Sequence, residues 1–218
     1  MLALFSNILF RYYIKPLLLP MPIKTAIPYD NGHFFITFTC YKWLPLISLS
    51  DGYTLIYNWF NILKSQGHFI TGFVIMPNHV HATIAFCKTS KPINKIIGDG
   101  KRFIGYEIIK QLKKRNLTSV LQQLEDSVTT TDKKRGKLHE LWEASFDWKH
   151  CISDDFTWQK IDYMHENPRA GKWMLAANGV DYIHSSAKFY STGVQGIYPV
   201  LNFKNLHDIN LTISFNTP

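Results

Sequence analysis

Two histidines separated by a single residue, His79 and His81, stand in the segment Met-Pro-Asn-His-Val-His near the middle of the chain. Side chains alternate along a β-strand, so two residues at this spacing point to the same face, about 7 Å apart along the backbone. Neutral imidazole is a common ligand for divalent metal ions. The spacing alone fits a metal site and equally fits two surface histidines.

A second group of reactive residues lies in the segment Tyr163–Pro168, which reads Tyr-Met-His-Glu-Asn-Pro. On a helix, Tyr163 and Asn167 would share a face, and Pro168 predicts that the helix ends near Asn167 because the residue before proline disfavours the α conformation. That face would lie at the carbonyl end of the helix dipole, which favours a nearby cation. A phenol can attack phosphorus when a metal ion polarises the phosphate, and Glu166 is a second candidate ligand. His165 is expected to point away from Tyr163. The alternative interpretation of Tyr163 is a packing residue, because most of the 11 tyrosines must be packing residues.

The elements that must position these groups follow from hydrophobic periodicity. Runs rich in β-branched and aromatic residues predict strands at 33–41, 69–76 and 80–86, and alternation predicts a fourth at 142–152. Pro77 and Asn78 suit a tight turn, so the second and third strands are predicted to form an antiparallel hairpin. Apolar residues at helical spacing predict helices at 51–65 and 92–115.

Caps and helix breakers refine these predictions. The helix at 51–65 is expected to begin behind Ser50 or Asp51, and a further helix to begin at Asp154 or Asp155 and to reach about Asn167. Gly98 and Gly100 each weaken the helix at 92–115 by up to ~1 kcal/mol relative to alanine, which allows a break there. The polar stretch 116–136 is expected to be a loop or a loosely helical insertion.

The order strand, helix, strand, strand, helix, strand, helix predicts an α+β fold with one antiparallel sheet and with helices packed mainly on one face. The length of 218 residues suits one domain, which we place at 21–218 with an insertion at about 116–137. Residues 1–20 are apolar but lack the pattern of a signal peptide, so we interpret them as an upstream extension with Met21 as an alternative start. A membrane-surface anchor is the alternative interpretation.

The charge of the chain favours a polyanionic partner. The formal net charge is +8, and basic residues gather on the polar positions of the helix predicted at 92–115. This basic track is interpreted as a binding surface for DNA phosphates, with a solvated helix face as the alternative. Its candidate DNA-binding residues are Lys101, Arg102, Lys110, Lys113 and Lys114.

Cysteine usage and hydropathy bear on the compartment. Cys40, Cys87 and Cys151 are widely spaced and form no CxxC pair, so a disulfide framework or zinc knuckle is not expected. The expected compartment is a reducing cytoplasm. The sequence contains no run of about 20 consecutive apolar residues, so a spanning helix and a membrane partner are not expected.

Two of these segments resemble a known family. The segment Gly72–His81 is similar to the hallmark of the single-tyrosine insertion-sequence transposases, a group within the HUH nucleases. The segment Tyr163–Pro168, followed by Arg-Ala-Gly, resembles the tyrosine helix of the REP-associated tyrosine transposase branch, and 181–190 resembles the tail of that branch. The two main motifs in this order, separated by a basic helix, are specific, and the resemblance covers about residues 28–195.

The resemblance implies a ferredoxin-like, RRM-like four-stranded sheet with the histidines on a central strand and the tyrosine on a facing helix. It implies Mg²⁺ or Mn²⁺ held by His79, His81 and Asn167. It also implies cleavage of single-stranded, hairpin-flanked DNA by Tyr163, which would leave a 5′-phosphotyrosine and a free 3′-hydroxyl. Members of the family include monomers and homodimers.

Two other classes of function remain open. A non-catalytic nucleic-acid binding protein with an RRM-like sheet would stack bases on strand aromatics such as Phe34 and Phe38. It gives no reason for His79, His81 and Tyr163 to occur together. A small metalloenzyme acting on another substrate would explain the histidines but not the basic helix.

Overall fold

The protein is described by a computed structural model over residues 26–170 and 173–214. The predicted extension at 1–20 and the alternative start at Met21 lie outside the described residues. No helix in the described ranges is both long and apolar enough to cross a membrane. Cys40, Cys87 and Cys151 are all buried and free, so no disulfide joins them.

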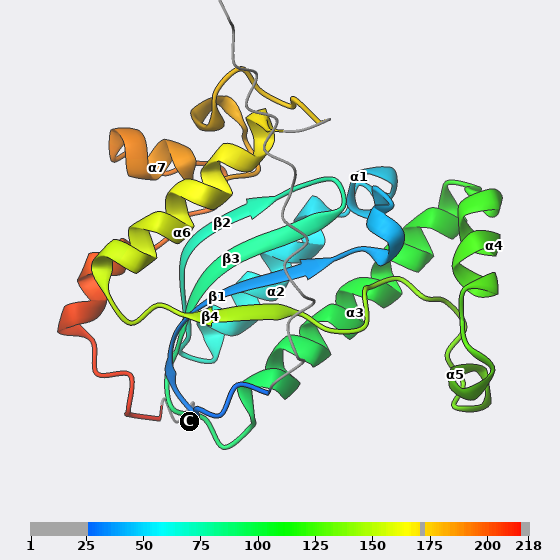
Figure 1. The fold of residues 1–218 in the computed structure, drawn as a ribbon, viewed down its shortest axis with the longest axis horizontal. Helices are drawn as coiled ribbons and strands as arrows, with labels where there is room; N and C mark the ends of the chain where they lie inside the picture. Colours follow the sequence, from blue (N-terminus) through cyan, green and yellow to red (C-terminus); the bar gives the residue numbers. More distant parts are fainter. Residues whose placement is uncertain (1–25, 171–172, 215–218) are drawn as a thin grey trace, which may run out of the picture.

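One four-stranded antiparallel sheet forms the centre of the fold (Figure 1). Its strand order is β2-β3-β1-β4, and every neighbouring pair is antiparallel. With helices between β1 and β2 and between β3 and β4, this is the ferredoxin-like topology that the sequence predicted. The strands are β1 (Gly32–Thr39), β2 (Phe69–Ile75), β3 (His79–Phe86) and β4 (Asp147–His150).

The fourth strand is shorter than the predicted range 142–152. Only Asp147–His150 pair with β1, and Trp142 makes an isolated bridge to Cys40. The Trp142 indole turns instead toward helix α3 (Ile93–Lys114) and donates a hydrogen bond of 2.8 Å to the Lys101 carbonyl. Residues 135–146 therefore form a strap that runs along α3 before the chain enters the sheet.

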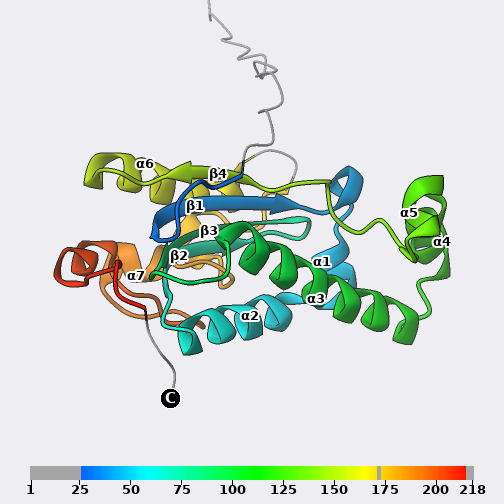
Figure 2. The ribbon, with the colours of Figure 1, turned by 90° about the horizontal axis from the view of Figure 1, so that it is seen from below.

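Two long helices cover one face of the sheet and bury the main core (Figure 2). They are α2 (Tyr53–Ser65) and α3 (Ile93–Lys114). Alternate strand residues such as Phe34, Ile36 and Phe38 point toward them and are almost fully buried. This side of the fold agrees with the predicted helices on one face.

Helix α3 runs unbroken through Gly98 and Gly100, where a break was allowed. A Cβ atom built on Gly100 would lie 2.2 Å from Nε1 of Trp59, whereas one on Gly98 would meet nothing within 4 Å. Gly100 is therefore needed for the close approach of α3 to α2. Packing against α2 outweighs the low helix propensity of glycine here.

The opposite face of the sheet is covered by α6 (Asp154–Glu166). A second, smaller core joins this helix to the sheet through residues such as Phe35, Val74, Ile161 and Met164. The sheet thus has a thick helical layer on one side and a single helix on the other. His79 and His81 face that single helix.

Shorter elements complete the fold. They are η1 (Tyr41–Trp43), α1 (Leu46–Ser50), α4 (Thr118–Asp126), α5 (Thr130–Lys134), η2 (Asn167–Arg169), η3 (Gly179–Asp181), α7 (Ala187–Thr192) and η4 (Phe203–Asp208). The insertion at 116–136 is therefore mainly helical. It is anchored by Leu124, which is fully buried.

The predicted helix caps were wrong at both sites. Helix α2 begins after Gly52 without a side-chain cap, because the short helix α1 precedes it and Asp51 takes a left-handed conformation between the two. The N-cap of helix α6 is Ser153, one residue before the predicted caps, and its hydroxyl accepts a hydrogen bond from the backbone N–H of Phe156. Asp154 and Asp155 occupy the first turn instead, where they complement the helix dipole.

The segment after α6 holds that helix against the edge strand β2. The Ser186 hydroxyl lies 2.8 Å from Nε2 of His165 and accepts a hydrogen bond from the backbone N–H of Phe73. The Tyr182 hydroxyl donates to the Ile75 carbonyl. These contacts fix α6 at one distance from the sheet, and with it the residues that face the histidines.

Candidate active site

His79 and His81 lie on β3, one of the two central strands of the sheet, and the centroids of their rings are 4.8 Å apart. Nδ1 of His79 lies 2.7 Å from Oδ1 of Asn78, and Nδ1 of His81 lies 2.6 Å from the Thr37 hydroxyl. Each ring is thus fixed through Nδ1, which leaves Nε2 for another partner. A hydrogen bond of this kind sets the tautomer and orientation of a metal-binding histidine.

Burial keeps both imidazoles neutral. It lowers the pKa of His79 to about 4, while a hydrogen bond to the Asn167 side chain acts in the opposite direction. Burial lowers the pKa of His81 well below its usual value, and the neighbouring His79 lowers it further. Neutral imidazole is the form that binds a metal ion, so this environment presents both side chains in their ligating state.

Tyr163 comes from α6 and lies over the histidine pair. Its ring stands edge-on to His81, with 5.4 Å between the centroids, and edge-on to Phe35 at 6.1 Å. The side chain is 55% exposed, so a substrate can reach the hydroxyl from solvent. The structure therefore brings the predicted nucleophile and the predicted histidines together from elements more than 80 positions apart in sequence.

Asn167 is the fourth residue of the candidate site, beside His79, His81 and Tyr163, and the following Pro168 determines how its side chain is held. As predicted, the helix ends near Asn167: α6 ends at Glu166 and passes into a 3-10 turn, although Asn167 itself keeps an α conformation (φ −54°, ψ −40°). Because Pro168 has no N–H, the backbone N–H of Asn167 takes the Met164 carbonyl. The Tyr163 carbonyl is then satisfied by Nδ2 of Asn167 at 2.8 Å. This bond fixes the amide so that its oxygen is the atom available to the two imidazoles.

The neighbours of Tyr163 in the motif have other partners. Glu166 lies 2.9 Å from the Arg169 guanidinium in an exposed ion pair, and its role as a second ligand stays a prediction. His165 is buried and points away from Tyr163, as expected, toward Ser186. Among the described residues, no group of three or more His, Cys, Asp or Glu side chains could hold a metal ion. The resemblance implies the Asn167 amide as the third protein ligand, and this assignment stays a prediction.

The donor set fits the implied metal. Both imidazoles on β3 interact with the Asn167 side chain at the end of α6, so two nitrogen donors and one amide lie close together. A mixed set of nitrogen and oxygen ligands without thiolate suits Mn²⁺ or Mg²⁺ better than a soft ion. Three protein ligands also leave coordination positions for water or a phosphate.

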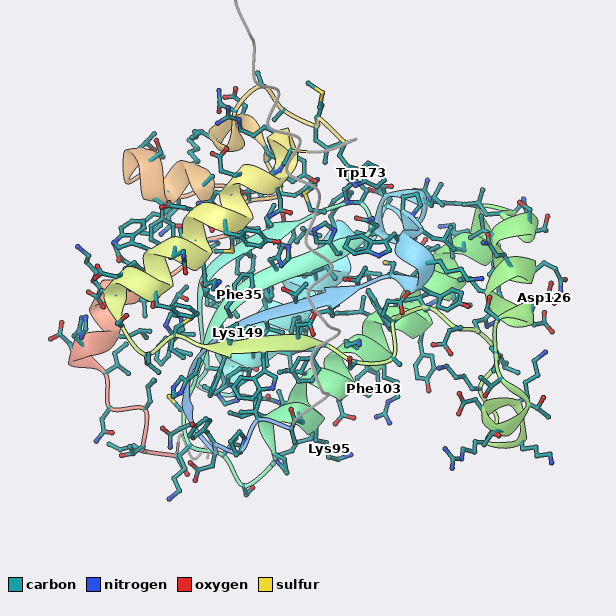
Figure 3. All side chains as sticks on the ribbon, viewed as in Figure 1. Phe35, Lys95, Phe103, Asp126, Lys149 and Trp173 are labelled. Carbon is teal, nitrogen blue, oxygen red and sulfur yellow. The ribbon has the colours of Figure 1, made fainter. Side chains whose placement is uncertain are left out.

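The rim of the site carries aromatic and basic groups that the sequence did not single out. The Trp43 indole is 57% exposed and lies 5.6 Å from His79 between ring centroids. Nζ of Lys160, on α6, lies 5.9 Å from the Phe35 ring, and Lys149 lies opposite Phe35 on β4. Phe35 and Lys149 are labelled in Figure 3 on these two paired strands. The site face therefore has its own cations.

The basic residues predicted to bind DNA lie elsewhere. All belong to α3, on the face of the sheet opposite the histidines. Arg102, Lys110, Lys113 and Lys114 are exposed, and their role in DNA binding stays a prediction. The sheet therefore separates all five side chains from the face that carries His79 and His81.

The prediction that Lys101 is free to meet solvent or phosphate was wrong. Its side chain is buried, and Nζ donates hydrogen bonds to the carbonyls of Glu143 (3.2 Å) and Ser145 (2.8 Å). Burial lowers the pKa of Lys101 to about 8. Lys101 follows Ile97 by four residues and precedes Ile104 by three, so it falls on the buried stripe of α3.

The aromatic residues of the non-catalytic alternative are also inaccessible. Phe34 and Phe38 are 0% and 1% exposed because they point into the core under α2 and α3. They cannot stack on bases. The strand aromatic that faces the other side of the sheet is Phe35, which is covered by α6.

Sequence reasoning missed the two residues that orient the histidines. Asn78 precedes His79 and was assigned only a turn role, although its side chain contacts Nδ1 of His79 and also donates to the Trp43 carbonyl at 3.1 Å. Thr37 is paired with His81 across β1 and β3. The only signal for Thr37 in the sequence is its place on the β1 face that alternation leaves opposite Phe34, Ile36 and Phe38.

The chain aligns with several solved structures, including the following two. The chain aligns with a REP-associated tyrosine transposase bound to a REP hairpin, with 15% identity over 83% of this chain and 89% of the other, at a TM-score of 0.49. It also aligns with a protein assigned as a transposase from Deinococcus radiodurans, with 14% identity over 68% of this chain and all of the other, at a TM-score of 0.35. No protein-family model and no curated protein matches the sequence. The chemistry of the site therefore rests on its own residues.

Proposed function

We propose that this protein is a metal-dependent, single-stranded DNA endonuclease and transesterase of the transposase type. One observation carries the proposal: the exposed Tyr163 ring lies beside a buried, neutral histidine pair whose free nitrogens converge with the Asn167 amide. A tyrosine used only for packing would not require this arrangement. The sequence resemblance to single-tyrosine transposases names the same residues independently.

The proposed reaction is a phosphoryl transfer to the phenol. The Tyr163 oxygen attacks a backbone phosphorus, a new O–P bond forms, and the bond from phosphorus to the 3′-oxygen breaks. The phenolic proton passes to solvent, and the departing 3′-oxygen takes up a proton to become a free hydroxyl. The 5′-phosphotyrosine keeps the energy of the cleaved bond, so attack by a 3′-hydroxyl reverses the step and rejoins the strand.

His79, His81 and Asn167 would hold Mg²⁺ or Mn²⁺ in this site. When bound, the ion polarises the phosphate oxygens and neutralises the charge that develops on them. Thr37 and Asn78 hold the imidazoles in place through their Nδ1 atoms. Lys149 and Lys160 supply positive charge for the backbone phosphates on either side of the cleaved one.

Hairpin-flanked DNA is the proposed substrate because the sequence resembles transposases that act on it. The nucleophile and the three metal-binding residues meet within a single chain, so a monomer contains a complete site. A homodimer would contain two such sites.

The proposal is tested by incubating the protein with single-stranded hairpin DNA and Mn²⁺ and measuring a covalent protein–DNA adduct on a denaturing gel. Tyr163→Phe should abolish the adduct. Tyr29→Phe is the matched control, since Tyr29 is 47% exposed and its ring lies against Phe34, which points away from the histidines. An adduct that persists in Tyr163→Phe would overturn the proposal.

A further inference from the structure

A groove with a volume of about 930 Å³ lies between α3 and the 135–146 strap, away from the histidines. We name it the α3 groove. One wall is a single helical face formed by Gly98, Arg102, Tyr106, Ile109 and Lys113, and the other is the strap. In Figure 1 the strap is the chain that leads from α5 to β4. Its size is at the upper end of the range of about 300–1,000 Å³ for binding pockets.

The groove is held open by fixed contacts. The strap is tied to α3 by the Trp142 indole, which donates to the Lys101 carbonyl, and by Nζ of Lys101, which donates to two strap carbonyls. Gly98 contributes no side chain to the wall, and a Cβ built there would meet nothing within 4 Å. The cavity is therefore part of the folded structure rather than a gap that side chains fill.

The charged residues of the groove favour an anionic occupant. Five basic residues and two carboxylates line it. Lys101 is occupied by the strap, and Glu140 pairs with Lys137 at 2.6 Å. Arg102 pairs with Asp99 at 3.1 Å, and Arg135 lies 3.9 Å from Asp132, but both side chains stay exposed. Lys113 is also exposed, on the wall opposite Arg135. Phosphates passing along the groove would meet a cation on each side.

The uncharged residues of the groove favour a base rather than a bare anion. Tyr106 is 63% exposed and Leu138 is 68% exposed, so both present apolar surface to the cavity. Bases of a single strand stack on aromatic rings of this kind regardless of sequence. A duplex keeps its bases paired inside and could use only the cations.

The groove also leads toward the proposed active site. Phe146 lines its end, and the next residue, Asp147, is paired with Thr37 across β4 and β1. The Thr37 hydroxyl contacts His81. A strand leaving the groove at Phe146 therefore has only the short edge strand β4 to cross before it reaches the histidine face.

We propose that the α3 groove is a second binding site, which takes single-stranded DNA next to the cleaved position, with a base on Tyr106 and phosphates on Lys113 and Arg135. The choice of DNA rests on the proposed function; the groove and its lining do not. Lys113, which we predicted as a DNA-binding residue from sequence, thus acquires a specific partner site.

The test uses pairs of neighbouring residues in which only one lines the groove. Lys113 and Arg135 line it, whereas Lys114 and Lys134 do not; Tyr106 lines it, whereas Phe103, 59% exposed on the same helix, does not. Phe103 is labelled in Figure 3. Binding of a strand of about 16 thymidines is measured without metal ions, so that no cleavage takes place, at a series of salt concentrations.

Tyr106→Ala should weaken binding about 5- to 150-fold, and Phe103→Ala should leave it unchanged. Lys113→Ala and Arg135→Ala should each reduce the salt slope by about 0.7, the value for one phosphate contact of a single strand, while Lys114→Ala and Lys134→Ala should not. Equal effects within each pair would overturn the proposal. So would an equal loss of affinity from Tyr106→Ala for duplex DNA of the same length.

A third variant fills the groove without removing any group. Gly98→Leu places an apolar side chain into open space and should weaken binding of the strand while leaving the unfolding midpoint equal or higher. Unchanged binding would contradict the proposal. Adduct formation at Tyr163 is measured separately. If the adduct forms but Tyr106→Ala leaves the affinity unchanged, only the groove proposal is contradicted. If the groove binds DNA but no adduct forms, only the proposed activity is contradicted.

Discussion

The Thr37 hydroxyl lies 2.6 Å from Nδ1 of His81 and so fixes that imidazole with Nε2 toward Tyr163 and Asn167. The contact depends on the register of β1 against β3, which places Thr37 directly opposite His81. It makes a threonine with no reactive role of its own part of the site. The first prediction follows from this contact.

Thr37→Val keeps the shape of the side chain but removes the hydroxyl. We expect it to weaken metal affinity by about 10- to 100-fold, the usual effect of losing a partner behind a metal ligand. The measurement is the Mn²⁺ concentration needed for half-maximal cleavage. Thr83→Val is the control, because Thr83 is on the same face of β3 and its buried hydroxyl has no hydrogen-bond partner within the described structure. Equal metal requirements for the two variants would contradict the role of Thr37.

Removing either histidine should separate cleavage from binding. His79→Ala and His81→Ala should each abolish cleavage, and chelation of the metal should do the same, while much of the DNA affinity remains because phosphate contacts lie on other side chains. Cleavage is measured on a labelled hairpin strand and affinity by gel shift. Undiminished cleavage by the double variant would remove the metal assignment.

Asn167 and Glu166 are adjacent but face different partners, so they form a second matched pair. Asn167→Ala removes both the third ligand and the bond to the Tyr163 carbonyl, and we expect a large loss of cleavage with a higher metal requirement. Glu166→Ala removes a surface ion pair with Arg169, worth about 0–1 kcal/mol of stability, and should leave cleavage unchanged. The reverse order of effects would show that Glu166 is the ligand after all.

Two glycines in α3 should respond oppositely to the same substitution. Gly98→Ala meets open space and should raise the free energy of unfolding by up to ~1 kcal/mol through helix propensity. Gly100→Ala drives a methyl group into Trp59 and should lower it by about 1–3 kcal/mol. Urea denaturation checks both. A stabilised Gly100→Ala would mean that α2 and α3 can move apart without loss.

Stability should fall in mild acid, and His68 should account for part of the loss. Burial lowers its pKa from 6.5 to about 4, so the folded state binds fewer protons than the unfolded state between these values. The free energy of unfolding is therefore not reduced by His68 above pH 6.5, and it falls as the pH drops from 6.5 toward 4. His68→Leu should reduce the pH dependence of the free energy of unfolding in this window, by at most about 1.4 kcal/mol per pH unit. An unchanged slope would show that His68 does not titrate with folding.

The sequence by itself determined most of the fold. Alternating apolar residues on four segments, with helical spacing between them, are sufficient to predict an antiparallel sheet with helices, and the β2–β3 hairpin follows from Pro77 and Asn78. It also identified His79, His81 and Tyr163 as candidates, but their spacing alone fits surface or packing residues equally well, and only the resemblance to a known family assigned them chemical roles. Local preferences were less informative at the ends of elements. Helix α6 is capped by Ser153 rather than by Asp154 or Asp155, and Asn167 keeps an α conformation before Pro168, because hydrogen bonds rather than propensity decided these ends.

Only the tertiary structure decided which side chains meet. Sequence spacing says nothing about the register of β1 against β3, which brings Thr37 to His81, or about the packing of α6 on the sheet, which brings Tyr163 to the histidines. It also decided which cations are free. Lys101 looks like its exposed neighbours in sequence but lies on the buried stripe of α3, where the carbonyls of Glu143 and Ser145 satisfy its ammonium group. Contacts between distant segments depend on how faces pack, and a periodic pattern specifies each face but not its partner.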